Sequence, residues 1–124
     1  MAYKVLIVED SRASREFIAS TVGAIDGVEV ITTASGFDAL KLLPRHRFDL
    51  IITDINMPDI NGLELINFVK KNPNYRETPL FIVTAEGREQ DRQRGLELGA
   101  AEFLVKPLAP DFLESLLRQY LKLA

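Results

Sequence analysis

Residues 49–54 decide the fold, because they read Asp49-Leu50-Ile51-Ile52-Thr53-Asp54, an apolar run that ends at a carboxylate. Three further runs have the same form and are followed by polar residues: Lys4–Val8 before Glu9 and Asp10, Pro79–Val83 before Thr84, and Ala101–Val105 before Lys106. Each run has the length and β-branched content of a buried parallel strand. Ligands of an open α/β sheet bind at the carboxyl ends of its strands, so the sequence predicts that these polar residues meet in one place.

The composition narrows the possible functions. The 124 residues suffice for one domain, residues 1–124, with a substantial core. A net charge of −3 and a pI near 5.2 argue against a strongly basic face, so we expect no nucleic-acid partner. The absence of cysteine excludes disulfides and thiolate metal sites, and the single histidine excludes a multi-histidine site within one chain. No apolar run is long enough to cross a membrane and no signal-peptide pattern opens the chain, so we expect a cytoplasmic protein without a membrane partner.

Strand and helix patterns alternate along the whole chain. Besides the four runs, we expect a strand at residues 28–33 and helices at about 11–24, from 35 to Pro44, from 61, at about 88–98, and from Pro110 to the end. The helix positions expected to face the core are Phe17, Ile18, Thr21, Val22, Leu63, Ile66, Val69, Phe112, Leu113, Leu116, Leu117, Tyr120 and Leu121. This alternation predicts a doubly wound α/β fold, a five-stranded parallel sheet with five helices on its two faces. Because the last helix pattern reaches the end, we expect no attached output domain.

Four motifs at the strand ends carry a resemblance that covers essentially the whole chain. They are Val8-Glu9-Asp10, the segment from Asp54 through Met57-Pro58 to Asn61-Gly62, Thr84-Ala85-Glu86, and Lys106-Pro107. With these motifs in this order, the chain resembles the response-regulator receiver domains, and most closely the stand-alone, CheY-like type. The resemblance implies the flavodoxin-like strand order 2-1-3-4-5 and a cis bond between Lys106 and Pro107.

Asp54 is the predicted phospho-acceptor. A carboxylate can attack a phosphoryl group and hold it as an acyl phosphate. Lys106 would supply positive charge to the attacking carboxylate and then to the phosphoryl oxygens. Thr84 would donate its hydroxyl to a phosphoryl oxygen, and Ala85 leaves space beside it. We therefore expect Asp54, Lys106 and Thr84 to act together.

Glu9 and Asp10 are the predicted magnesium ligands, because Mg²⁺ prefers hard oxygen ligands and uses one or two carboxylates with phosphate oxygens. Asp54 faces the same metal. The resemblance implies that the backbone carbonyl of Asn56 also binds it. Most receivers have two aspartates where this chain has Glu9-Asp10, and the longer glutamate favours contact through a water molecule. With Mg²⁺ and Lys106 present, the charge of the three acids is balanced.

The resemblance also implies how the signal is used. Thr84 moves toward the phosphoryl group, and the aromatic residue at the position of Phe103 turns inward. We expect a histidine kinase as phosphodonor and an unidentified protein target, bound through the face formed by residues 88–98, 101–105 and the helix from Pro110. Related domains dimerise there through two acids before the switch aromatic, but this chain has Ala101-Glu102, so we expect a monomer. No enzymatic activity is expected beyond its own phosphorylation and dephosphorylation.

Four other functions fit parts of the sequence. A phosphorelay carrier, which passes the phosphoryl group to a histidine phosphotransfer protein, is not separated from a terminal switch by these residues. A flavin-binding, flavodoxin-like protein needs a hydroxyl- and glycine-rich loop, whereas Glu9-Asp10-Ser11 is acidic. An aspartyl-phosphate hydrolase needs a second acid at the position of Asn56 and a cap domain. A structural pseudo-receiver is disfavoured because no site residue is missing.

Overall fold

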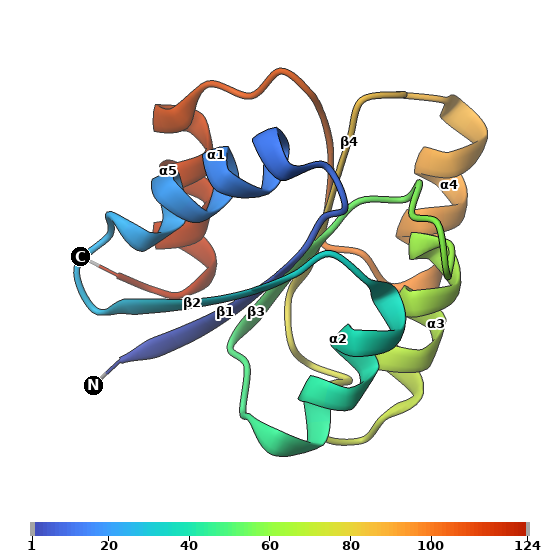
Figure 1. The fold of residues 1–124 in the computed structure, drawn as a ribbon, viewed down its shortest axis with the longest axis horizontal. Coiled ribbons are helices and arrows are strands. Elements are labelled where there is room, and N and C mark those ends of the chain that lie inside the picture. The colour runs from blue at the N-terminus through green and yellow to red at the C-terminus, as the bar shows by residue number, and fades with distance from the viewer. Residues whose placement is uncertain (1, 124) are drawn as a thin grey trace.

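The computed structural model describes residues 2–123 and contains one five-stranded parallel sheet (Figure 1). Its strands are β1 (Tyr3–Val8), β2 (Val28–Thr33), β3 (Leu50–Thr53), β4 (Leu80–Thr84) and β5 (Glu102–Val105). Their spatial order is β2-β1-β3-β4-β5, which confirms the predicted order. In this order the chain reverses direction across the sheet between β1 and β3, which places a crevice at the carboxyl edge.

Helices cover both faces of the sheet. They are α1 (Arg12–Gly23), α2 (Gly36–Leu42) with a following 3₁₀ turn (Leu43–Arg45), α3 (Gly62–Lys71), α4 (Glu89–Leu98) and α5 (Pro110–Tyr120). Figure 1 shows α1 and α5 together on one face, and α2, α3 and α4 on the other. Side chains of Ser11, Ser35 and Asn61 cap the amino ends of α1, α2 and α3, and Gly99 ends α4 with a φ of 116°.

Alternating strand residues build two apolar layers. On the α1/α5 face the sheet contributes residues such as Ile7, Ile52 and Phe81, and on the other face residues such as Leu6, Ile51 and Ile82. The central strands β1, β3 and β4 are almost wholly buried, as expected for a parallel sheet covered on both sides. Each fully buried aliphatic side chain contributes about 1.5–3 kcal/mol to folding, so the strand ends are held on a rigid base.

Two of the predicted core positions are wrong. Phe17 and Phe112 are 40% and 50% exposed, because α1 and α5 rest on the i, i+4 pairs that begin one residue later, at Ile18 and Leu113. Leu63 is half-buried and packs against the core beside Gly95 of α4, and Leu65 is a fully buried position of α3 that the sequence analysis did not name. The expectation that the last helix reaches the chain end is also wrong, since α5 ends at Tyr120; residue 124 lies outside the described residues.

The loop after β3 is fastened to the start of α2. The Asp59 carboxylate accepts hydrogen bonds from the Ser35 hydroxyl (2.5 Å) and from the backbone N–H groups of Gly36 (3.2 Å) and Phe37 (2.9 Å). These bonds, led by the one from Ser35, hold the pKa of Asp59 well below its usual range. Ile60 packs directly on Gly36, where a Cβ atom would overlap its Cγ2. The loop that begins at Asp54 is therefore anchored at its other end, where Asp59 and Ile60 contact the start of α2.

Candidate functional site

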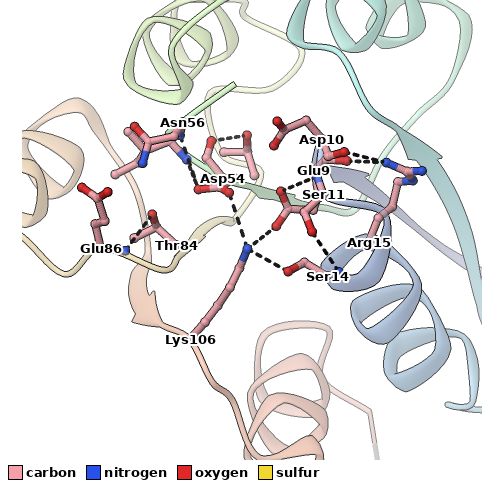
Figure 2. A network of polar contacts seen from close by, with 12 residues as sticks. Glu9, Asp10, Ser11, Ser14, Arg15, Asp54, Asn56, Thr84, Glu86 and Lys106 are labelled. Atoms are coloured by element: carbon pink, nitrogen blue, oxygen red, sulfur yellow. Dashed lines mark hydrogen bonds and ion pairs between the residues drawn. The ribbon is translucent and has the colours of Figure 1, made fainter. Parts of the chain in front are cut away.

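The predicted polar residues meet at the carboxyl edge of the sheet. Figure 2 shows the Lys106 ammonium group between the carboxylates of Glu9 and Asp54, with Asp10 beyond Glu9 and Thr84 on the opposite side of Asp54. Glu9 and Asp10 both follow β1, and the others follow or end β3, β4 and β5, so the parallel register of these four strands places them. The structure thus brings together residues that are up to 97 positions apart in the sequence.

Lys106 is the centre of the polar network. Its ammonium nitrogen donates to the Glu9 carboxylate, to the Ser14 hydroxyl at 3.1 Å and to the Asp54 carboxylate at 3.5 Å. The side chain is 19% exposed, so these contacts are only weakly screened by solvent. The bond between Lys106 and Pro107 is cis, as the resemblance implied. The arrangement places one positive charge between two negative ones.

Asp54 is a buried carboxylate with two differently held oxygens. The residue is 8% exposed. Oδ1 accepts hydrogen bonds from the backbone N–H groups of Ile55 (2.6 Å) and Asn56 (3.4 Å), whereas Oδ2 faces Lys106. Two backbone bonds fix the plane of the carboxylate and direct Oδ2 toward the ammonium group. Asn56 itself is exposed, and its backbone adjoins Asp54.

Glu9, Asp10 and Asp54 form an acidic cluster in which one carboxylate oxygen from each lies within 4.8 Å of the others. At that separation two unit charges repel by about 3.5 kcal/mol at an effective dielectric constant near 20. Burial raises the pKa of Glu9, the Lys106 hydrogen bond opposes the rise, and the charge of Asp54 adds to it. The single ammonium of Lys106 leaves the cluster negative.

The donor set fits a magnesium ion. All three side chains offer carboxylate oxygens, the hard ligands that Mg²⁺ prefers, and their spacing allows one ion to touch each of them. Asp10 is exposed, whereas Glu9 is 1% exposed and already accepts hydrogen bonds from Lys106 and from the backbone N–H of Ser11 at 3.3 Å. Asp10 and Asp54 are therefore the more accessible ligands.

Two contributors to the site escaped the sequence analysis. Arg15 donates from one guanidinium nitrogen to the backbone carbonyls of Glu9 (2.9 Å) and Asp10 (3.3 Å), which holds the loop that carries both acids. Ser14 contacts Lys106. Both residues lie in the first turn of α1, directly after the acidic pair, and this closeness in sequence is the signal that could have revealed them.

Thr84 and Phe103 lie on the same face of the sheet. Ile82 pairs with Phe103 and Thr84 pairs with Val105, so alternation puts Ile82, Thr84 and Phe103 on the side covered by α3 and α4. Thr84 is fully buried, and its hydroxyl oxygen accepts a long hydrogen bond (3.5 Å) from the backbone N–H of Glu86. Phe103 is half-buried. Movement of one side chain can therefore change the space open to the other.

The family follows from comparison with known proteins. The family model described as the response regulator receiver domain matches residues 5–118. The chain belongs to this family. Receiver domains act in two-component signalling, in which they take phosphate from histidine kinases, and phosphorylation and magnesium binding are general to them. Among residues 2–123 of this receiver domain, no helix is long and apolar enough to cross a bilayer.

Relatives and solved structures agree with this assignment. The chain is 34% identical over 119 residues to a chemotaxis protein CheY homologue of Campylobacter jejuni, with 95% of this chain and 92% of the relative covered. It is 36% identical over 121 residues to the probable transcriptional regulator ycf29 of Pyropia yezoensis, where it covers 94% of itself but only 52% of the relative. The chain thus spans about half the length of that relative and nearly all of the CheY homologue.

Two solved structures have closely similar folds. Chemotaxis response regulator CheY4 of Vibrio cholerae has a TM-score of 0.88 and 37% identity, covering 97% of this chain and 99% of that one. The receiver domain of the sensor histidine kinase PA1611 from Pseudomonas aeruginosa has a TM-score of 0.88 and 25% identity, covering 98% of this chain and 99% of that one. In that structure a magnesium ion is coordinated in the active-site cleft.

Proposed function

We propose that this receiver domain is a phospho-accepting switch in which Asp54 takes a phosphoryl group from a histidine kinase. The observation that carries the proposal is the position of Lys106, whose ammonium lies 3.5 Å from Asp54 Oδ2 in a site that otherwise holds three acids. A lysine so placed can stabilise negative charge on the nucleophile and on the group transferred to it. Phosphorylation of receiver domains by histidine kinases is general to the family.

In the proposed reaction, Asp54 Oδ2 attacks phosphorus while backbone N–H groups hold Oδ1. A new O–P bond forms, the P–N bond to the donor imidazole breaks, and the imidazole nitrogen keeps the electron pair. Mg²⁺ held by Glu9, Asp10, Asp54 and the Asn56 carbonyl would neutralise charge on the phosphoryl oxygens. Lys106 would stabilise the negative charge first on the attacking carboxylate and then on the phosphoryl group. Thr84 turns its hydroxyl toward a phosphoryl oxygen beside the exposed Ala85.

The signal would leave through the face of α4, β5 and α5. Phosphorylation adds charge and strong acceptors at Asp54, which draws in Thr84 and opens space for Phe103 on the same side of the sheet. The domain would thus bind a cytoplasmic protein target differently in its two states. It would act on no substrate but itself, promoting only its own phosphorylation and dephosphorylation.

We infer that the active domain stays monomeric and does not bind DNA. The one acid before Phe103, Glu102, accepts a 2.6 Å hydrogen bond from the Tyr120 hydroxyl of the same chain, which competes with a charge pair across a dimer interface. Light scattering with and without beryllofluoride, a phosphoryl mimic, should give the mass of one chain in both cases. A tight activated dimer, or binding of duplex DNA at physiological salt, would refute this.

Acetyl phosphate labelling tests the proposed nucleophile. Incubation with Mg²⁺ should add one base-labile, acid-stable phosphate to the wild-type chain and none to Asp54→Asn. Asp49→Asn is the matched control, because Asp49 adjoins the opposite end of β3, where its carboxylate accepts from the Lys4 backbone N–H at 2.8 Å. Full labelling of Asp54→Asn, or loss of labelling in both variants, would contradict the assignment.

A further inference from the structure

We propose that Ser14 is a positioning residue that fixes the Lys106 ammonium for phosphoryl transfer. An ammonium group has three N–H donors. In this structure its partners are Glu9 Oε1, Asp54 Oδ2 and Ser14 Oγ, contributed by the ends of β1 and β3 and by α1 (Figure 2). Among the described residues no other polar partner of this nitrogen is found, so donors and acceptors match in number.

The third acceptor changes what the first two can do. Two carboxylates alone define a line, and an ammonium held by both can still rotate about that line and slide along it. The closer Glu9 carboxylate then competes with Asp54 for the charge. A third acceptor off the line fixes both the position and the rotation. Because the Ser14 hydroxyl is neutral, it restrains the ammonium without adding a further negative charge to the crowded cluster.

The surroundings of Ser14 make its hydroxyl hard to replace. Ser14 and Lys106 lie in the wall of a groove of about 300 Å³ whose other lining residues are apolar. These are Ala13, Phe17, Ile18, Val83, Pro107 and Leu108. Without the hydroxyl, one N–H of Lys106 would face this apolar wall. The ammonium would then leave its position or take a water molecule of the groove as its third partner, and a mobile water holds it less firmly than a hydroxyl fixed on α1.

This role rests on the proposed function, because it gives Ser14 an effect on phosphoryl transfer through Lys106 alone. Ser14 touches neither Asp10 nor Asp54 through any contact found in the described residues. Its loss should therefore slow the transfer step and leave magnesium affinity unchanged. A serine that only supported the local structure would not lower the rate of phosphoryl transfer while leaving magnesium affinity unchanged.

The experiment compares Ser14→Ala with Ser14→Thr, which keeps a hydroxyl, and with the control Ser20→Ala, an exposed serine on the same helix. Phosphorylation by acetyl phosphate is followed over a range of donor concentrations, and magnesium affinity is measured by calorimetry. We expect the maximal rate of Ser14→Ala to fall about tenfold, equivalent to about 1.4 kcal/mol, with magnesium affinity unchanged. Ser14→Thr should recover most of the rate, and Ser20→Ala should match the wild type.

Crystal structures of the wild type and Ser14→Ala provide a readout that needs no phosphorylation. We expect Lys106 Nζ to shift by more than about 0.5 Å or to lose its single position in the variant. An unshifted Nζ, or a maximal rate equal to that of the wild type, would overturn the role of Ser14. If the wild type itself is not phosphorylated, the proposed function fails, while the crystal structures still decide whether Ser14 positions Lys106.

Discussion

Gly62 offers a sharp test of how strictly the fold controls the phospho-acceptor, because the first residue of α3 packs on the backbone of Asp54. A Cβ atom at Gly62 would lie 2.8 Å from Ile55 Cα, 2.9 Å from the Asp54 carbonyl carbon, and less than 2.5 Å from the Asp54 carbonyl oxygen. Real Cβ atoms essentially never approach other atoms within 3.0 Å. All three neighbours are backbone atoms, so no side-chain rotation relieves the overlap. Gly62→Ala must therefore displace either α3 or the Asp54 peptide by at least about 0.5 Å.

The displacement should lower both stability and activity. Overpacking of this kind costs about 1–3 kcal/mol of unfolding free energy, and for a chain of this length each kcal/mol lowers the melting temperature by about 4 °C. Because the Asp54 carboxylate moves with its backbone, a shift of about 0.5–1 Å should slow phosphorylation by acetyl phosphate about 10- to 100-fold. Calorimetric melting and phosphate labelling measure the two effects on the same sample.

Gly23→Ala is the matched control for this experiment. A Cβ atom at Gly23 would meet only Val30 Cγ2, at an ordinary 3.7 Å, so this variant should melt and react like the wild type. A Gly62→Ala variant with wild-type melting temperature and labelling rate would refute the reasoning. It would mean that the contact between α3 and Asp54 is loose enough to absorb a methyl group.

Three other predictions concern the metal, α5 and the lifetime of the phosphoryl group. Magnesium at ten times its dissociation constant should stabilise the wild type by about 1.4 kcal/mol and Asp10→Ala by much less; equal shifts in thermal melts would count against the site. Tyr120→Phe should cost about 1 kcal/mol at pH 7, because it loses the hydrogen bond to Glu102. That bond raises the pKa of Tyr120 above 10.0, so its contribution to stability should be complete below pH 10 and disappear as the pH rises through the folded-state pKa. Urea unfolding of both proteins at several pH values checks this, and a stability difference between wild type and Tyr120→Phe that stays constant with pH would contradict it. The aspartyl phosphate should be short-lived in magnesium buffer, because the exposed polar side chains of Asn56 and Glu86 can orient water, and persistence for many hours would contradict this.

The sequence predicted the parallel sheet and the meeting of Glu9, Asp54 and Lys106, because both follow from one rule, whereas the strand order was implied by the resemblance to receiver domains. Apolar runs long enough to be buried strands can be recognised in the sequence, and parallel strands bring their carboxyl ends to one edge of the sheet. Ser14 and Arg15 were missed for the opposite reason. Serine and arginine in the first turn of a helix are common, and only the three-dimensional structure shows that they reach Lys106 and the loop carbonyls of the acidic pair.

The errors in the helices have a similar physical origin. An apolar residue next to a core position, such as Phe17 or Phe112, has the right chemistry for burial but lies about 100° around the helix from its buried neighbour. Which of the two faces the sheet depends on how the whole helix rests on it. The contacts of Asp59 with Ser35 and Phe37 were likewise beyond reach, since they join segments more than 20 residues apart without a periodic pattern.

Because Asp59 and Ile60 contact the start of α2, the loop after β3 and the first turn of α2 depend on each other and should be inherited together. Gly36 has no room for a Cβ atom beneath Ile60, so a larger residue at position 36 can be accepted only with a smaller one at position 60. Loss of the Asp59 carboxylate likewise removes the partner of the Phe37 N–H, and another acceptor at the amino end of α2 must then replace it. In descendants of this chain, these positions should therefore change in concert. A protein engineer who transplants the loop after Asp54 into another scaffold should move the first turn of α2 with it.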